Sequence, residues 1–187
     1  MEFVERRLTQ RAKRGDREAF AELVEIYKDK IFQLAYRMTG SRQEAEDIAQ
    51  ETFLRVFANL HVYDESYKFS TWIYRIATNL CIDRKRKKRP DFSLDEQVDG
   101  AEGLDWYSRL SAKDMTPEES VMTRELQDTV QGALLQLSPK YRSIMILRYI
   151  EDLTLQEISA VLELPITTIK TRIHRGREAL RKKLRFM

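Results

Sequence analysis

The stretch TLQEISAVLELPITTIKTRIHRGREALRKKL, residues 154–184, contains the start and end signals of two consecutive helices. TLQE has the form of a capping box, in which the side chains of Thr154 and Glu157 each accept from the other residue's backbone N–H at a helix start. The turn LELP separates this short helix from a longer, strongly basic one. Together they predict a helix-turn-helix. The inward residues are expected to be Ile158, Val161 and Leu162 in the short helix and Ile166, Ile169, Ile173, Leu180 and Leu184 in the long one.

Positive charge is concentrated in the last 22 residues, which hold eight Lys or Arg and one acid, although the whole chain has a net charge of only +3. Arg and Lys in the first half of such a helix can reach guanine acceptors, and Thr can contact a thymine methyl group or a phosphate. A solvated basic face is the alternative interpretation, which the cap, the turn and the β-branched inner face disfavour. The residues expected to project outward are Thr167, Lys170, Thr171, His174 and Arg175, followed by Arg177, Arg181, Lys182 and Lys183 at phosphates.

The composition predicts a helical cytoplasmic protein. Hydrophobic residues make up 42% of the 187 residues, and the longest apolar run is far shorter than a membrane span. The first residues, MEFVERRLTQRAKRG, lack the apolar core of a signal peptide. Cys81 is the only cysteine, which rules out an intrachain disulfide and fits a reducing compartment.

Apolar periodicity predicts an all-α chain of two small helical domains joined by an acidic linker. Residues 1–90 are expected to form three helices, which begin after Asp16, at the SRQE capping box of 41–44, and at Ser70. Residues 91–115 are the predicted linker, since nine acids lie within 91–119. Residues 116–187 are expected to form four helices. The first two of these begin at TPEE and SPKY, which each pair a capping residue with Pro.

Most of these helices are expected to bury one apolar stripe. The stripes of the first domain are Phe20, Leu23, Tyr27, Ile31, Leu34 and Met38, then Ala45, Ile48, Thr52, Val56 and Leu60, then Ile73, Ile76, Ala77 and Leu80. The stripe of the helix after residue 116 is Leu126, Val130, Ala133, Leu134 and Leu137.

Aromatic residues alternate with cations around the start of the third helix. This mixture suits single-stranded nucleic acid, because bases stack on rings while cations follow the phosphates. The alternative interpretation is that Trp72 belongs to the core. The residues concerned are Tyr63, Tyr67, Lys68 and Phe69 in the stretch NLHVYDESYKF, and Trp72, Arg75, Asn79, Asp83 and Arg86 on one face of the helix.

The second helix has a mixed acidic and apolar face turned away from its predicted core. Such a face is poor for DNA but suits a protein partner, and the alternative is an ordinary exposed surface. Its residues are Asp47, Gln50, Glu51, Leu54, Arg55 and Ala58.

Four segments in order resemble the diagnostic segments of extracytoplasmic-function (ECF) sigma factors, of the sigma-W type. They are GDREAFAELVEIYKDKIFQLAYRMTG, AEDIAQETFLRVFANL, KFSTWIYRIATNLCIDRKRKK and LTLQEISAVLELPITTIKTRIHRGREALRKKL. The resemblance covers nearly the whole chain. It implies an initiation subunit of bacterial RNA polymerase that directs the core enzyme to promoters and helps to open the −10 region.

The resemblance also implies partners and sites. The RNA polymerase core is expected to bind through its clamp helices and its flap, with the clamp helices on Asp47, Gln50, Glu51, Leu54 and Arg55. Single-stranded −10 DNA is expected on Tyr63, Tyr67, Lys68, Phe69, Trp72, Arg75, Asn79 and Arg86. Duplex −35 DNA is expected on Thr167, Lys170, Thr171, Arg172, His174, Arg175 and Arg177. The family implies an anti-sigma factor, which holds its sigma factor at the membrane where it is membrane-anchored.

Two positions depart from the family pattern. Gly or Asn is more usual where Glu163 lies, and Gly is frequent where Thr167 lies. If position 163 needs a positive φ, Glu costs on the order of 1 kcal/mol there.

Two other functions compete with a sigma factor. A stand-alone helix-turn-helix regulator would fit the second domain but would leave the partner-type face and the aromatic loop of the first unexplained. An enzyme acting on nucleic acid would need chemistry that the chain lacks, because no His, Cys or carboxylate spacing indicates a metal site and no glycine-rich phosphate loop occurs. We therefore predict no metal, no cofactor and no enzymatic activity.

Overall fold

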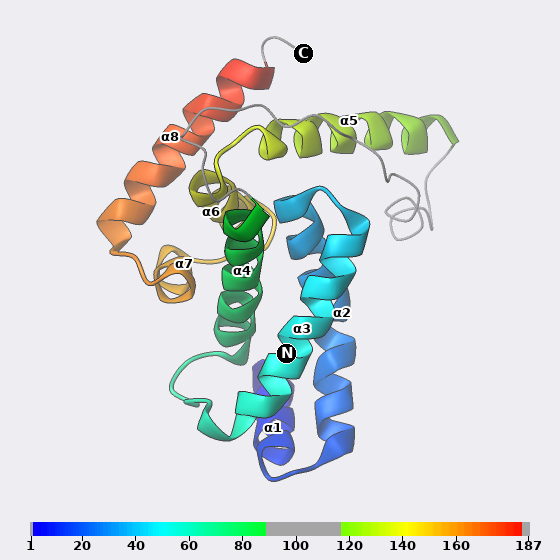
Figure 1. The fold of residues 1–187 in the computed structure, drawn as a ribbon, viewed down its shortest axis with the longest axis vertical. Helices are drawn as coiled ribbons and strands as arrows, with labels where there is room; N and C mark the ends of the chain where they lie inside the picture. The colour runs from blue at the N-terminus through cyan, green and yellow to red at the C-terminus, as the bar shows by residue number, and fades with distance from the viewer. Residues whose placement is uncertain (1, 89–116, 185–187) are drawn as a thin grey trace.

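The computed structural model describes residues 2–88 and 117–184 (Figure 1), and these residues are helical without any strand. The first domain comprises α1 (Glu2–Lys13), α2 (Arg17–Thr39), α3 (Arg42–Asn59), a 3-10 turn η1 (Leu60–Val62) and α4 (Phe69–Lys88). The second comprises α5 (Pro117–Leu135), α6 (Pro139–Tyr149), α7 (Leu155–Leu162) and α8 (Ile166–Leu184). The all-α class and the helix-turn-helix are confirmed. The acidic linker and the predicted Thr116 cap lie outside the described residues.

Helix α1 corrects the prediction of three helices in the first domain. It packs against α2 and α4 and buries Leu8, which is 1% exposed, although Phe3 is 79% exposed. The Tyr27 hydroxyl donates to Glu5 at 2.5 Å and ties α1 to α2. Val4, Leu8 and Ala12 recur at every fourth residue, but no capping residue precedes them, and the sequence analysis missed this helix.

The predicted helix starts are mostly confirmed. Asp16 accepts from the N–H groups of Glu18 and Ala19 at 3.1 Å each, which lowers the pKa of its carboxylate. Ser41 accepts from the Glu44 N–H at 3.3 Å. Ser138 precedes Pro139 at the cap position, but its hydroxyl makes no cap hydrogen bond.

The predicted core stripes are largely buried, with two corrections in the second domain. Leu126 is 65% exposed, so the inward face of α5 begins later, at half-buried Val130. Leu184, at 44% exposed, extends beyond the packed part of α8. The rest of the predicted α8 stripe is buried or half-buried.

The two domains pack against each other around one continuous core. Helix α7 lies against α4, while α5 and α6 lie against α2 (Figure 1). Gly40, with a φ of +76°, ends α2 so close to α5 that a Cβ there would lie 2.8 Å from a methyl carbon of Leu135. The sequence analysis predicted each domain but not this junction.

Candidate nucleic-acid and partner interfaces

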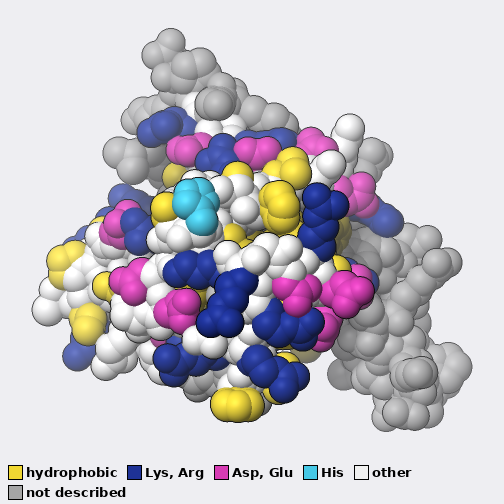
Figure 2. Space-filling model, turned by 90° about the horizontal axis from the view of Figure 1, so that it is seen from below, with side chains coloured by type: hydrophobic (Ala, Val, Ile, Leu, Met, Phe, Trp, Pro, Cys, Tyr) yellow, Lys and Arg dark blue, Asp and Glu magenta, His cyan; other side chains and the backbone are white. Residues whose placement is uncertain are grey.

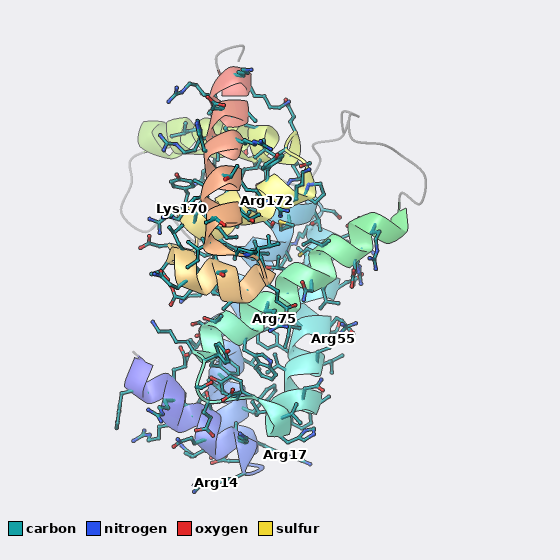
Figure 3. The ribbon with its side chains drawn as sticks, turned by 90° about the vertical axis from the view of Figure 1, so that its left-hand side faces the viewer. Arg14, Arg17, Arg55, Arg75, Lys170 and Arg172 are labelled. Carbon is teal, nitrogen blue, oxygen red and sulfur yellow. The ribbon has the colours of Figure 1, made fainter. Side chains whose placement is uncertain are left out.

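The outer face of α8 presents most of its predicted DNA-contacting side chains to solvent. Thr167, Lys170, Thr171, His174, Arg175 and Arg177 are exposed, whereas Arg172 is half-buried. Lys170 and Arg172 lie on opposite sides of the helix (Figure 3), as the angle of about 100° per residue requires. Arg172 is therefore less well placed for a groove than its neighbours.

Helix α8 is held firmly on α6. Gly176 is buried, and a Cβ there would lie 2.9 Å from the sulfur of Met145. A side chain at position 176 would displace Met145, so glycine lets the two helices approach closely.

Both ends of α7, including the turn before α8, are built as the sequence predicted. Thr154 and Glu157 form the complete capping box of α7. Glu163 ends α7 with a φ of +54°, in the left-handed region. Partial burial acts to raise the pKa of Glu157, but hydrogen bonds from Thr154 and from Lys68 lower it overall. Glu157 is therefore held as a carboxylate.

The aromatic residues at the start of α4 divide into two groups. Tyr63 and Phe69 are 6% and 3% exposed, and their ring centroids lie 5.8 Å apart in a cluster with Trp72. Burial, followed by nearby carboxylates, raises the pKa of Tyr63 to about 12. Tyr67 is 59% exposed and Trp72 is half-buried. Only the latter two rings are accessible for stacking on a base in this arrangement, and the former two support them from within.

The polar residues of the same face are accessible but largely paired. Lys68 lies 3.2 Å from Glu157, and Arg75 pairs with Glu163, so both partners come from the second domain. Arg86 lies 3.2 Å from Asp83 on its own helix. Asn79 is exposed. A cleft separates this face from α7, with Tyr67, Trp72 and Arg75 on one side and Ser159, Ala160 and Glu163 on the other.

The outer face of α3 forms the wall of an apolar groove. Asp47, Gln50, Leu54 and Arg55 are exposed and Glu51 is half-buried. Leu54 and Phe57 are 58% and 57% exposed. The groove is lined by Arg17, Phe20, Gln50, Phe53, Leu54 and Phe57, and Arg55 lies on α3 beside it (Figure 3).

Ion pairs organise the polar edge of this groove. Glu51 and Arg55 pair along α3 at 2.8 Å, and Asp47 pairs with Arg84 of α4 at 3.0 Å. The sequence analysis missed Arg17, Phe53 and Phe57, and it assigned Phe20 to the core. The signal that could have found two of them is the i, i+4 spacing of Phe53 and Phe57 outside the buried stripe.

The end of the molecule formed by α1 and the loop after α3 has a different character. Lys and Arg side chains there are interspersed with Asp and Glu (Figure 2). Arg11 pairs with Asp16 at 2.7 Å, and Lys13 lies 3.5 Å from Glu65. Because the charges are mixed and paired, this end is a weaker candidate for DNA than α8.

Two family models match the chain, sigma-70 region 2 over residues 23–90 and sigma-70 region 4 over residues 127–180. Over 185 residues the chain is 54% identical to the ECF RNA polymerase sigma factor SigW of Bacillus subtilis, with 99% of both chains covered. The chain belongs to the ECF sigma factors. Like its family, this sigma factor directs RNA polymerase to promoters, and nothing found supports a stand-alone regulator.

Other relatives agree in sequence and in fold. This sigma factor is 36% identical over 183 residues to the RNA polymerase sigma-H factor of Pseudomonas aeruginosa, covering 96% of its own chain and 93% of the relative. CnrH, solved in complex with the cytosolic domain of CnrY, shares the fold with a TM-score of 0.70 and 24% identity over 97% of both chains. RpoE of Bartonella quintana, solved in complex with the anti-sigma factor NepR, shares the fold with a TM-score of 0.65 and 20% identity. The match covers 89% of this chain and 96% of RpoE.

The described part of the chain offers neither a metal-binding cluster nor a membrane-spanning helix. No group of three or more His, Cys, Asp or Glu side chains there could hold a metal ion. Within the same residues, no helix is both long and apolar enough to cross a membrane.

Proposed function

We propose that this sigma factor distributes promoter recognition over three surfaces. The groove on α3, with Asp47, Gln50, Glu51, Leu54 and Arg55, binds the clamp helices of core RNA polymerase. The face of α4 and the preceding loop bind the single-stranded −10 element, through Tyr67, Lys68, Trp72, Arg75, Asn79 and Arg86. The outer face of α8 reads the −35 duplex, with Lys170, Thr171, His174 and Arg175 nearest the bases.

The proposal follows the predicted domain division. Residues 1–90 carry the polymerase and −10 surfaces, residues 91–115 link the domains, and residues 116–187 carry the −35 surface and contact the flap. The protein acts in the cytoplasm without a cofactor, a metal or an enzymatic activity of its own. An anti-sigma factor regulates it by covering the groove on α3; a solved structure of similar fold, RpoE, is in complex with the anti-sigma factor NepR.

The exposed apolar groove on α3 carries this proposal. Monomeric proteins rarely leave large apolar side chains grouped on a surface unless a partner covers them. Phe20 and Phe57, which both line the groove, contact each other edge to face with ring centroids 5.1 Å apart. An apolar centre with charged residues at its edge is the usual form of a protein interface.

Leu54→Asp tests the groove as the polymerase site. Because Leu54 is 58% exposed, its loss leaves no cavity, and we expect the melting temperature to stay within a few degrees. A buried carboxylate at the interface should weaken core binding by about 100-fold or more. Core polymerase titrations followed by fluorescence anisotropy measure this.

Leu126→Asp is the matched control, because Leu126 is 65% exposed but lies on α5, away from the groove. It should leave core affinity close to that of the parent. Equal affinity of Leu54→Asp and the parent for core would remove α3 from the polymerase site.

A further inference from the structure

The two cations nearest the start of the α4 face are paired with carboxylates of the second domain. Lys68 Nζ lies 3.2 Å from Glu157 Oε1, and an Arg75 guanidinium nitrogen contacts Glu163 Oε1. Glu157 belongs to α7 and Glu163 to the turn before α8. A cation that already has a carboxylate partner must release it before it binds a phosphate.

Both carboxylates are held in place by local backbone structure. Glu157 uses its Oε2 atom for the capping box, accepting from the Thr154 N–H at 2.9 Å and from its hydroxyl at 2.8 Å, which leaves Oε1 directed at Lys68. Glu163 has a φ of +54°, a conformation that Gly or Asn adopts more readily. The strained residue is the one whose side chain reaches across to Arg75. A Gly or Asn at this position would relieve the strain but could not make that contact.

The surrounding packing brings α7 onto this part of α4. Lys68, Trp72 and Arg75 follow one another at the spacing of a single helix face. Across the cleft from Trp72, α7 presents the small side chains of Ser159 and Ala160. Small residues let α7 approach α4 closely enough for the two ion pairs to form.

Contacts elsewhere hold the domains together independently of these pairs. Arg142 of α6 donates to the Met38 carbonyl oxygen at the end of α2, at 2.5 Å. The Tyr74 hydroxyl of α4 donates to Glu151, which follows α6. The closed arrangement therefore does not depend on Glu157 and Glu163, which leaves their pairing with the −10 cations to be explained.

We propose that Glu157 and Glu163 form a built-in anionic cover of the −10 surface: in the free chain they occupy, on Lys68 and Arg75, the positions of two phosphates of the −10 strand. This rests on the proposed role of α4 in −10 binding. Only the fraction of molecules with the cover open binds the strand, so the cover lowers the apparent affinity by that fraction. Binding to polymerase, which needs the domains at separate promoter elements, removes the cover.

The strength of the cover suits a switch. The side chains of Lys68, Arg75 and Glu163 are 49%, 42% and 63% exposed, so water screens their ion pairs. Two such pairs can change an equilibrium by roughly three- to tenfold. That is enough to lower the affinity of the free chain for the strand measurably, whereas separation of the domains on polymerase must also break the junction contacts of Arg142 and Tyr74.

The test measures binding of a fluorescent single-stranded −10 oligonucleotide to the full free chain. In the double variant Glu157→Gln with Glu163→Gln, both carboxylates are lost, whereas Gln retains the capping box. We expect the affinity to rise about three- to tenfold. Glu163→Asn, which fits the left-handed conformation, should give part of the same gain, so the result does not depend on one variant. Melting curves verify that each variant folds.

The matched control is Glu22→Gln with Glu125→Gln, which removes two exposed acids that lie on α2 and α5. An equal rise in this control would show a general charge effect and overturn the cover, as would unchanged affinity of the double variant.

Lys68→Ala and Arg75→Ala, assayed in holoenzyme on a premelted promoter, test the underlying −10 role separately. Weaker binding by these variants supports that role whatever the free chain does. Undiminished binding by both would overturn it, and the cover with it.

Discussion

Arg142 is a fully buried cation that has carbonyl groups as its partners. It is 2% exposed and donates to the carbonyl oxygens of Leu134, Leu135, Leu137 and Met38. Burial lowers its pKa to about 10, which still leaves it charged at neutral pH. The acceptors lie at or just beyond the C-terminal ends of α5 and α2, where helix dipoles favour a positive charge. The Arg142 side chain thus caps the C-terminal end of α5 and joins the two domains.

Arg142→Met should destabilise the protein by about 3 kcal/mol, because it leaves several buried carbonyl oxygens without donors. Arg148→Met is the control, since Arg148 donates one such bond, to Leu153 O at 2.8 Å, and should cost about 1 kcal/mol. Urea unfolding midpoints measure both. Equal stability of the two variants would mean that water replaces the guanidinium at the junction.

The burial of single side chains such as Arg142 could not be predicted from the local sequence. Nothing in SPKYRSIMIL separates Arg142 from a solvated arginine, because its acceptors come from other helices. The opposite error occurred at Leu126, which continues an apolar spacing but is 65% exposed. Tyr63 and Phe69 were predicted as base contacts, yet they lie in the aromatic core. Periodicity identifies which residues are apolar on one side, but not what covers that side.

Helices with strong end signals were predictable as elements. The capping box at Thr154 and the Asp16 cap follow from local sequence, and both are present. Helix α8 was assigned correctly because its basic face and β-branched inner face differ sharply. Helix α1 was missed because no Ser, Thr, Asp or Asn precedes it as a cap, although it buries Leu8, Thr9 and Ala12. For the groove on α3, the sequence analysis predicted Gln50 and Leu54 but not Phe53 and Phe57, which lie outside the predicted buried stripe of the helix.

Within α8, we expect some cations to recognise bases and others to bind phosphates. Arg175 is exposed on the outer face of the first half, where a bidentate contact to guanine is possible. Arg175→Ala should cost roughly 1–3 kcal/mol on the cognate −35 element and relax the preference at one base pair. Lys182 lies about two turns further on. Lys182→Ala should weaken binding to all DNA sequences alike and lower the slope of log affinity against log salt concentration by about one unit.

Holoenzyme titrations on cognate and single-base-changed promoters, at several salt concentrations, distinguish these two roles. If Arg175→Ala and Lys182→Ala lose affinity equally on every sequence, Arg175 contacts only the backbone. Base recognition would then pass to Lys170 and Thr171, which are exposed one turn earlier.

For the whole molecule, the decisive feature is the junction between domains, which no local pattern encodes. Tyr74 of α4 donates to Glu151 of the second domain, and Lys30 and Arg37 of α2 act on the same carboxylate. Burial raises the pKa of Glu151, and the hydrogen bond and the two cations offset this only in part. The folded protein therefore holds a proton on Glu151 at a higher pH than the unfolded chain does.

The sign of the pH dependence follows from that difference. A carboxyl whose pKa is raised by folding contributes stability that is complete below its unfolded value, about 4.5, and is lost as the pH rises through the raised value. Glu151→Gln keeps an acceptor for Tyr74 but does not titrate. Its stability relative to the parent should therefore increase as the pH rises above about 4.5.

Glu157→Gln provides a comparison of opposite sign, because hydrogen bonds lower the pKa of Glu157 below 4.5 in the folded state. Its contribution is present above pH 4.5 and is lost as the pH falls through the lowered value. Relative to the parent, Glu157→Gln should therefore be less stable near neutral pH and approach the parent in acid. Urea unfolding of the parent and both variants from about pH 3 to 8 measures the two differences, and subtraction cancels the other titrating groups. If the stability of Glu151→Gln relative to the parent stays constant or falls as the pH rises, the Tyr74 hydrogen bond and the α2 cations outweigh burial at the junction.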